Sequence, residues 1–366
     1  MGSRPGNVMT RGFVVAVLAG ATVFAGAGAG AEAEARAEAR AGAEARADGD
    51  ALLFTFKDRR ITESSGLAVS PTHKDLYYTH NDSSAGPVFY AVGPNGRTRA
   101  TFTLRGAEAR DWEGMAATKD PVTGAGVLWF ADIGDNFDGA WPDVSVYKVT
   151  EPTTFTRTAL PTILPAVRYR FRYEDGGHNA EGVMVNPRTG RLYIVSKEFS
   201  GSVYAAPKRL RADRDNVLRK VGSAPIMATD AAYAPDGSSF VIRTYFSATV
   251  YRVPGEQIAR VSMPALDQAE SITYTPDGQA LLTGSEGTGS PVYRVPLPAD
   301  VLQRTAPKPA ATPMASRSIG DDTALVANAR ADEDADAGVP GSVVAAWLAV
   351  AAAATGMITF IARRTR

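Results

Sequence analysis

The sequence contains no cysteine and only three histidines. The missing thiols exclude disulfide bonds, thiolate catalysis and cysteine-ligated zinc, and three histidines leave little for a histidine-built metal centre. The charges balance, with 39 Lys and Arg against 39 Asp and Glu, so no net charge favours nucleic acid or an acidic substrate. The 366 residues are 45% hydrophobic and 21% charged, a globular composition in a chain too long for one ordinary domain. Functional chemistry therefore has to come from carboxylates, which favour hard cations or acid–base reactions.

The N-terminus has the pattern of an exported protein. Arg4 and Arg11 precede an uncharged run, 12–31, that starts with apolar residues and thins into Ala-Gly repeats. This pattern predicts a cleaved signal peptide over 1–31, and an uncleaved anchor is the alternative. Residues 32–50 form a low-complexity Ala, Glu and Arg tract without a hydrophobic face, which we expect to be a solvated spacer.

A second apolar run lies near the C-terminus. Residues 343–362 carry no charge and, at about 1.5 Å per residue in a helix, would span about 30 Å of bilayer. The arginines of the tail 363–366 place this end in the cytoplasm by the positive-inside rule. A buried core helix is the alternative. Residues 299–342 are rich in Ala, Pro and Asp, as expected of a stalk, so the sequence predicts an extracellular domain anchored in the cell membrane by one C-terminal helix.

The segment 51–298 repeats a strand pattern at intervals of about 40 to 60 residues. In each repeat a small-residue strand led by an acid or serine is followed by an apolar strand, a Val-aromatic strand and an alternating outer strand. The aromatic markers are Phe89, Tyr147, Tyr204, Tyr251 and Tyr293. Four strands per repeat predict an all-β fold, a β-propeller of five four-stranded blades.

The fifth repeat has no outer strand of its own. Residues 52–56 alternate and precede the first repeat without another partner, so we expect this N-terminal strand to complete the fifth blade and close the ring. Six blades are the alternative if the long stretch 151–178 holds more than the single strand that its pattern indicates.

The predicted topology sorts the acids onto two faces. Because chain direction alternates, the loop before the first strand of a blade and the loop after its second strand open on the same face. Asp and Gly in the opposite turns, such as 235–237 and 276–278, are explained by turn geometry alone. The shared face receives acids from every repeat, and converging carboxylates need a cation, basic partners or raised pKa values.

Three groups of candidate residues follow on this face. The candidate catalytic residues are Asp111, Glu113, Glu181, Lys197 and Arg243, the last two as stabilisers of an anionic group. The candidate ligands of Ca²⁺ or another divalent cation are Glu63, Asp132, Asp135, Asn136, Asp230 and Glu270. Further ligand-face residues are His80, Asn81, Asp82 and Glu286. The alternative is a structural network in which the acids cap strand-end amides.

Nucleophile motifs are missing from the sequence. It contains no Gly-x-Ser-x-Gly elbow, P-loop or HExxH motif, and a Ser-x-x-Lys match at 145–148 falls inside a repeated strand. Any catalysis would therefore use metal-activated water or paired carboxylates.

Short phrases in a fixed order resemble a group of exported bacterial β-propellers near the esterase-like and phytase-like propeller families. The likeness covers roughly residues 55–300, and its phrases lie at 63–68, 79–83, 111–113, 132–136, 180–182, 196–198 and 285–287. Propeller phytases are six-bladed and calcium-dependent. This chain is expected to have fewer blades and spaces its acids differently, so phosphate-ester hydrolysis does not follow from the resemblance alone.

Three functions are therefore open. The first is a cation-assisted hydrolase of carboxylic or phosphate esters, and the second is a non-catalytic cell-surface propeller that binds a ligand or protein. The third is a glycoside hydrolase with two carboxylates, which ranks last because the mouth loops show few aromatics for stacking sugars. None of them involves nucleic acid, and the membrane is reached only through the C-terminal helix.

Overall fold

The computed structural model describes residues 49–306, except 83–84 and 138. The predicted signal peptide, nearly all of the spacer, the apolar run 343–362 and the basic tail lie outside the described residues. No helix within the described part of the chain is long and apolar enough to cross a membrane.

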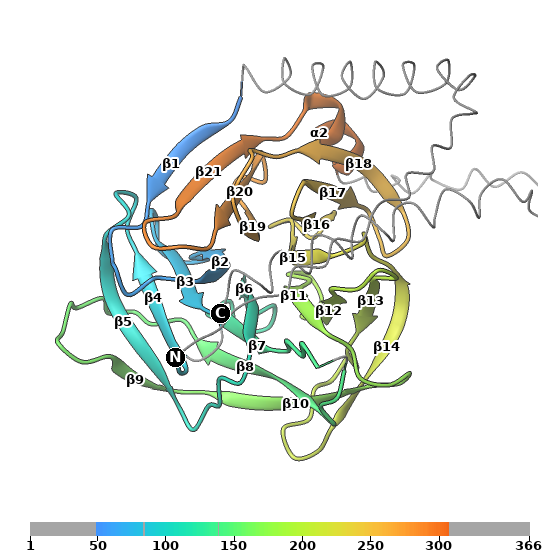
Figure 1. Ribbon diagram of the computed structural model, residues 1–366, viewed down its shortest axis with the longest axis horizontal. Coiled ribbons are helices and arrows are strands. Elements are labelled where there is room, and N and C mark those ends of the chain that lie inside the picture. The colour runs from blue at the N-terminus through green and yellow to red at the C-terminus, as the bar shows by residue number, and fades with distance from the viewer. Residues whose placement is uncertain (1–48, 83–84, 138, 307–366) are drawn as a thin grey trace, which may run out of the picture. The chain divides into compact units, whose positions relative to one another are not determined.

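Four-stranded meanders recur along the chain (Figure 1). The first consists of β2 (Ser64–Val69), β3 (Tyr77–Asn81), β4 (Val88–Val92) and β5 (Thr98–Arg105). The second consists of β6 (Trp112–Lys119), β7 (Gly126–Asp132), β8 (Val144–Thr150) and β10 (Val167–Tyr173). The third consists of β11 (Ala180–Val185), β12 (Leu192–Ser196), β13 (Ser202–Ala205) and β14 (Asn216–Ser223). The fourth consists of β15 (Ala228–Tyr233), β16 (Phe240–Thr244), β17 (Ser247–Tyr251) and β18 (Gln257–Ser262). The fifth consists of β19 (Ala269–Tyr274), β20 (Ala280–Ser285), β21 (Pro291–Pro296) and β1 (Ala51–Thr55).

The innermost strands surround one axis. β2 contacts β6, β6 contacts β11, β11 contacts β15, β15 contacts β19, and β19 returns to β2. Figure 1 looks along this axis, with the meanders arranged around it. Radial repetition of small antiparallel sheets is the arrangement of a β-propeller, as the repeats predicted.

The N-terminal strand closes the ring, as the sequence predicts. β1 pairs antiparallel with β21, with Leu52 opposite Tyr293, and so completes the last meander. Phe54 and Phe56 on and just after β1 are 5% and 2% exposed. The Phe54 ring lies 5.0 Å from that of Tyr77 in the first meander, so this segment joins the last meander to the first.

The stretch 151–178 holds two strands, where the sequence pattern indicated one. The additional strand, β9 (Thr162–Pro165), pairs in parallel with the outer edge of β5. Its side chains are largely exposed, so no alternating pattern marks it in the sequence. The other, β10, pairs with β8 and also in parallel with β14, which joins the second and third meanders into one eight-stranded sheet.

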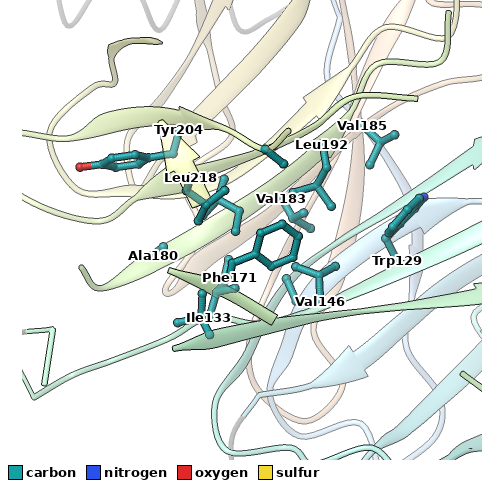
Figure 2. Packing of buried hydrophobic residues seen from close by; sticks show 14 of the residues in the cluster. Trp129, Ile133, Val146, Phe171, Ala180, Val183, Val185, Leu192, Tyr204 and Leu218 are labelled. Atoms are coloured by element: carbon teal, nitrogen blue, oxygen red, sulfur yellow. The ribbon is translucent and has the colours of Figure 1, made fainter. Parts of the chain in front are cut away.

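Alternating apolar side chains fill the spaces between meanders. Figure 2 shows one such cluster, where Phe171 and Val146 of the second meander meet Val183 and Leu192 of the third. After the last meander, α2 (Ala299–Thr305) lies in the segment expected to be a stalk. Its Val301 is 2% exposed and packs in a cluster with Ile258 of β18.

Small residues let the innermost strands approach closely. A side chain at Gly114 would place its first carbon 2.6 Å from the carbonyl oxygen of Glu181, and one at Gly182 would meet the Ala231 amide nitrogen at 3.0 Å. Only glycine fits such an approach. This close approach brings the acids at the starts of neighbouring innermost strands together at one end of the axis.

Candidate functional site

Strand register brings the loops of one face to a single opening. In every meander the start of the innermost strand lies opposite the end of the second strand. The pairs are Ser64 with Asn81, Trp112 with Asp132, Ala180 with Ser196, Ala228 with Thr244, and Ala269 with Ser285. We call the interacting polar side chains at this opening the acidic mouth, consisting of Asp82, Asp111, Glu113, Glu181, Lys197, Tyr245, Glu270 and Glu286.

Three carboxyl groups of the mouth are positioned to share a cation. One oxygen from each of Asp82, Asp111 and Glu113 lies within 4.8 Å of the others. Asp111 is 8% and Glu113 4% exposed. The Ser65 hydroxyl donates to Glu113 at 3.3 Å, and the Asn136 side-chain amide donates to Asp111 at 3.3 Å. Carboxylate oxygens grouped in this way suit a hard divalent cation.

Without a cation, Asp111 and Glu113 hold protons near neutral pH. Burial, followed by the charges of Asp82 and Glu181, raises the pKa of Asp111 to about 7. Burial and the neighbouring Glu181 and Asp82 also raise the pKa of Glu113 well above its usual range. A bound cation would replace these protons, since ligand carboxylates must be ionised.

The phrase 132–136 shapes the loop around the carboxyl group of Asp111. Asp132 accepts hydrogen bonds from the backbone amides of Arg110 and Asp111 at 2.9 and 2.8 Å. Asp135 accepts one from the amide of Trp141 at 2.7 Å. Asp132 thus binds the loop before β6, and Asp135 binds its own loop. Asn136 alone of the three predicted ligands in this phrase reaches the cluster. A methyl group on Gly134 would overlap carboxyl oxygens of Glu113 and Asp111, so glycine there leaves room for the pair.

The acidic mouth also contains one positively charged side chain, which forms an ion pair. The Lys197 ammonium lies 2.8 Å from Glu181 and 5.1 Å from the centre of the Tyr245 ring. Burial alone would lower the pKa of Lys197, but the charges of Glu181 and Glu270 outweigh it and raise that pKa. Burial raises the pKa of Glu270 to about 8 despite Lys197, and raises that of Glu286 to about 7 with the help of Asp82 and Glu63.

Two predicted site residues are completely buried in the wall of the propeller. Asp230 accepts hydrogen bonds from the amides of Ala231 and Ile272, at 2.7 and 2.8 Å, and so ties the fourth meander to the fifth. Arg243 is 0% exposed, and its guanidinium nitrogens find no hydrogen-bond partner among the described residues. Burial lowers its pKa to about 10 against the attraction of Glu270 and Asp230. In this structure, therefore, Arg243 does not reach the space where an anionic ligand would bind.

The first meander holds the remaining predicted residues. Asn81 accepts hydrogen bonds from the amides of Thr62 and Glu63, which fixes the loop before β2. His80 is completely buried, and burial lowers its pKa to about 4, so the ring is neutral at pH 7. Glu63 is exposed at the edge of the mouth.

Sequence reasoning missed Tyr245. This residue follows β16 at the position where Lys197 follows β12, so the repeat alignment contains the signal that finds it. In the sequence, Tyr245 looks like the first residue of the following strand. The register of β16 and β17 shows instead that it lies in the two-residue turn between them.

We expect the cation-free protein to lose stability as pH rises from about 5 to 8. Asp111, Glu286 and Glu270 have folded-state pKa values of about 7, 7 and 8, above their ordinary 3.8 and 4.5, so the unfolded chain binds fewer protons and the free energy of unfolding falls as pH rises. His80 acts in the opposite sense, but only below its ordinary value of 6.5. The melting temperature in chelator should therefore decline over this range and level off above pH 8. The melting temperature of the Glu286→Gln variant should decline less steeply with pH. A melting temperature that rises with pH would contradict this prediction.

Neither a family model nor a curated protein matches this chain. Among solved structures, a gluconolactonase from Xanthomonas campestris superposes with a TM-score of 0.40 and 14% identity, over 69% of this chain and 91% of that one. The structure of U3-55K superposes with a TM-score of 0.36 and 9% identity, over 64% of this chain and 80% of that one. The propeller assignment rests on the strand pairing described above.

Proposed function

We propose that the protein is a five-bladed β-propeller whose acidic mouth binds a divalent cation and uses it to hydrolyse an ester or phosphoester. The five contacting innermost strands, each heading one four-stranded meander, support five blades rather than six. The observation that carries the function is the group of half-buried Asp82 with buried Asp111 and Glu113, close to the Lys197–Glu181 ion pair. Oxygen ligands alone favour Ca²⁺ or a similar hard cation.

The mouth residues divide the chemistry among them. A cation held by Asp82, Asp111 and Glu113 would polarise the ester and lower the pKa of a bound water. Lys197, paired with Glu181, stabilises the negative charge that develops on the attacked group. As a water oxygen bonds to the ester carbon or phosphorus and gives up a proton to solvent, Glu270, protonated at neutral pH with its pKa of about 8, donates a proton to the departing alcohol.

Calcium titration tests this proposal directly. We expect Ca²⁺ to bind with one-to-one stoichiometry, to release protons, and to bind at least about tenfold more tightly for each unit that the pH rises toward 7, because Asp111 and Glu113 have to ionise first. Calorimetry in two buffers of different ionisation enthalpy measures the protons. Hydrolysis of a simple aryl ester or aryl phosphate should stop in chelator and return with Ca²⁺. Turnover that ignores chelation, or the lack of any binding, would rule the mechanism out.

A non-catalytic propeller is the second candidate, and the depth of the acids favours it. Glu113, Glu181 and Glu270 are only 3 to 4% exposed. Such burial is expected if these acids bind a structural cation that holds the innermost strands together. This function predicts cation binding and a saturable surface partner without turnover of any ester or phosphoester.

Export and anchoring belong to the same proposal. A signal peptide over 1–31 and a membrane helix over 343–362 would put the propeller outside the cell with the C-terminus in the cytoplasm. Extracellular calcium modules work with dissociation constants of about 10⁻⁴ to 10⁻³ M, so a weak site would suffice there.

A further inference from the structure

Three phenylalanines stand out from the otherwise buried aromatic residues. Phe137, Phe199 and Phe246 are 73%, 61% and 76% exposed. Every other phenylalanine in the described part of the chain is buried or half-buried. All three lie in loops that follow the second strand of a meander, after β7, β12 and β16. These loops open on the face of the acidic mouth, so aromatic exposure is confined to that face.

Two of the exposed phenylalanines lie next to residues of the acidic mouth in the sequence. Phe199 comes two residues after Lys197, and Phe246 directly follows Tyr245, with the Tyr245 and Phe246 ring centres 6.4 Å apart. Ile226 is 47% exposed in the adjoining loop.

Backbone hydrogen bonds hold these loops side by side. The amide of Met227 donates to the carbonyl of Glu198 at 3.1 Å, which joins the loop of Ile226 to that of Phe199. The amide of Lys197 donates to the carbonyl of Asn179 at 2.9 Å, and the Asn179 side chain accepts from the amide of Asp135 in the loop of Phe137. We call Phe137, Phe199, Ile226 and Phe246 the apolar shelf.

The rest of the rim differs in character. After β20 the chain continues Glu286-Gly287-Thr288-Gly289, and after β3 it continues with Asp82 and residues 83–86 of sequence SSAG. Neither loop carries a large apolar side chain. The mouth is therefore bordered by apolar groups on the second to fourth meanders, whereas Glu286 and Asp82, on the fifth and first, are acids. Isolated exposed apolar residues are ordinary, but a group of aromatics on one rim marks a binding surface.

We propose that the apolar shelf binds the alkyl or aryl arm of the ester or phosphoester whose reacting group lies on the Asp82, Asp111 and Glu113 cluster. This inference rests on the proposed function. The occupant is a small amphipathic molecule, because its anionic group would bind a cation at the mouth while its arm reaches Phe199, two residues after Lys197, and Phe246, next to Tyr245 of the mouth. An anionic bilayer surface fits less well, since the carboxyl groups of the mouth would repel it.

Binding of alkyl phosphates in the presence of Ca²⁺ tests the shelf without requiring turnover. We expect hexyl phosphate to bind at least about tenfold more tightly than ethyl phosphate by calorimetry, since each methylene that leaves water adds to affinity. In the double variant Phe199→Ser, Phe246→Ser, the affinities for hexyl and ethyl phosphate should lie within about threefold of each other, with the affinity for ethyl phosphate unchanged. Leu160→Ser removes a side chain that is 78% exposed away from the mouth, and this matched control should keep the full preference.

The outcomes separate the shelf from the catalysis. A chain-length preference without hydrolysis of any ester would support the shelf and overturn the proposed hydrolysis. Equal affinity for the two phosphates, a preference that survives in the double variant, or no phosphate binding at all would overturn the shelf. Sedimentation with phosphatidylcholine vesicles that is lost in the double variant would assign these residues to a membrane instead, and would likewise overturn it.

Discussion

Replacing Asp111 by Asn is expected to abolish cation binding at the acidic mouth and to lower ester hydrolysis at least about 100-fold. The carboxyl group of Asp111 lies within 4.8 Å of those of Asp82 and Glu113, and an amide in its place removes one negative charge from the set. Even residues that only orient metal ligands typically cost 10- to 100-fold in affinity or activity, so loss of a ligand should cost at least as much. Calcium calorimetry and the initial rate of hydrolysis measure the two effects separately.

The fold should survive this substitution. Asp132 holds the loop through the backbone amides of Arg110 and Asp111, and these bonds do not use the Asp111 side chain. Asp267→Asn is the matched control, since Asp267 is an exposed acid in the loop before β19 on the same face. This control should bind Ca²⁺ and turn over ester like the original protein. Unchanged binding in the Asp111 variant would place the cation elsewhere.

Removing the closing strand is expected to unfold the propeller or to lower its melting temperature by more than about 15 °C. A chain that begins at Lys57 loses Phe54 and Phe56, and deleting a buried phenylalanine side chain costs about 3 to 5 kcal/mol. It also exposes the backbone edge of β21. A total near 6 to 10 kcal/mol is comparable with the whole stability of an ordinary domain. Circular dichroism melting measures the change.

A chain that begins at Gly49 keeps β1 and provides the control, which should melt like the full chain. A synthetic peptide of residues 49–56, added to the truncated chain, should restore part of the melting temperature because it supplies the missing strand. The same peptide with Phe54→Ser should restore less. Equal melting of the two truncated chains would show that β1 does not fasten the ring.

The repeated meanders could be predicted from the sequence because the same residue types recur at the same positions in each one. Valine next to an aromatic, turn glycines and a leading acid or serine recur in each meander, and the closing strand of residues 52–56 follows from the same count. β9 was not readable, because its side chains are mostly exposed and it is held by backbone pairing with β5. Backbone pairing on an exposed edge leaves no periodic mark on side-chain type.

The sequence predicted which residues lie on the functional face, but not which of them contact one another. Glu113, Asp132 and Asp230 look alike in the sequence, each at the end of a strand on the same face. In the structure Glu113 joins the carboxyl cluster, while Asp132 and Asp230 accept backbone amide hydrogens. Arg243 likewise looked suited to hold an anion but is enclosed. A residue's role here depends on which amides and charges lie across the gap between meanders.

The all-β repeats, the strand that closes them and the face on which the acids gather follow from the amino-acid pattern alone, because these features depend on side chains within a few residues of one another in the chain. Folding in three dimensions sets which carboxyl groups meet, which accept hydrogen bonds from backbone amides, and which phenylalanines remain exposed at the rim. Those outcomes depend on distances between strands far apart in sequence, and a pattern along the chain does not encode such distances.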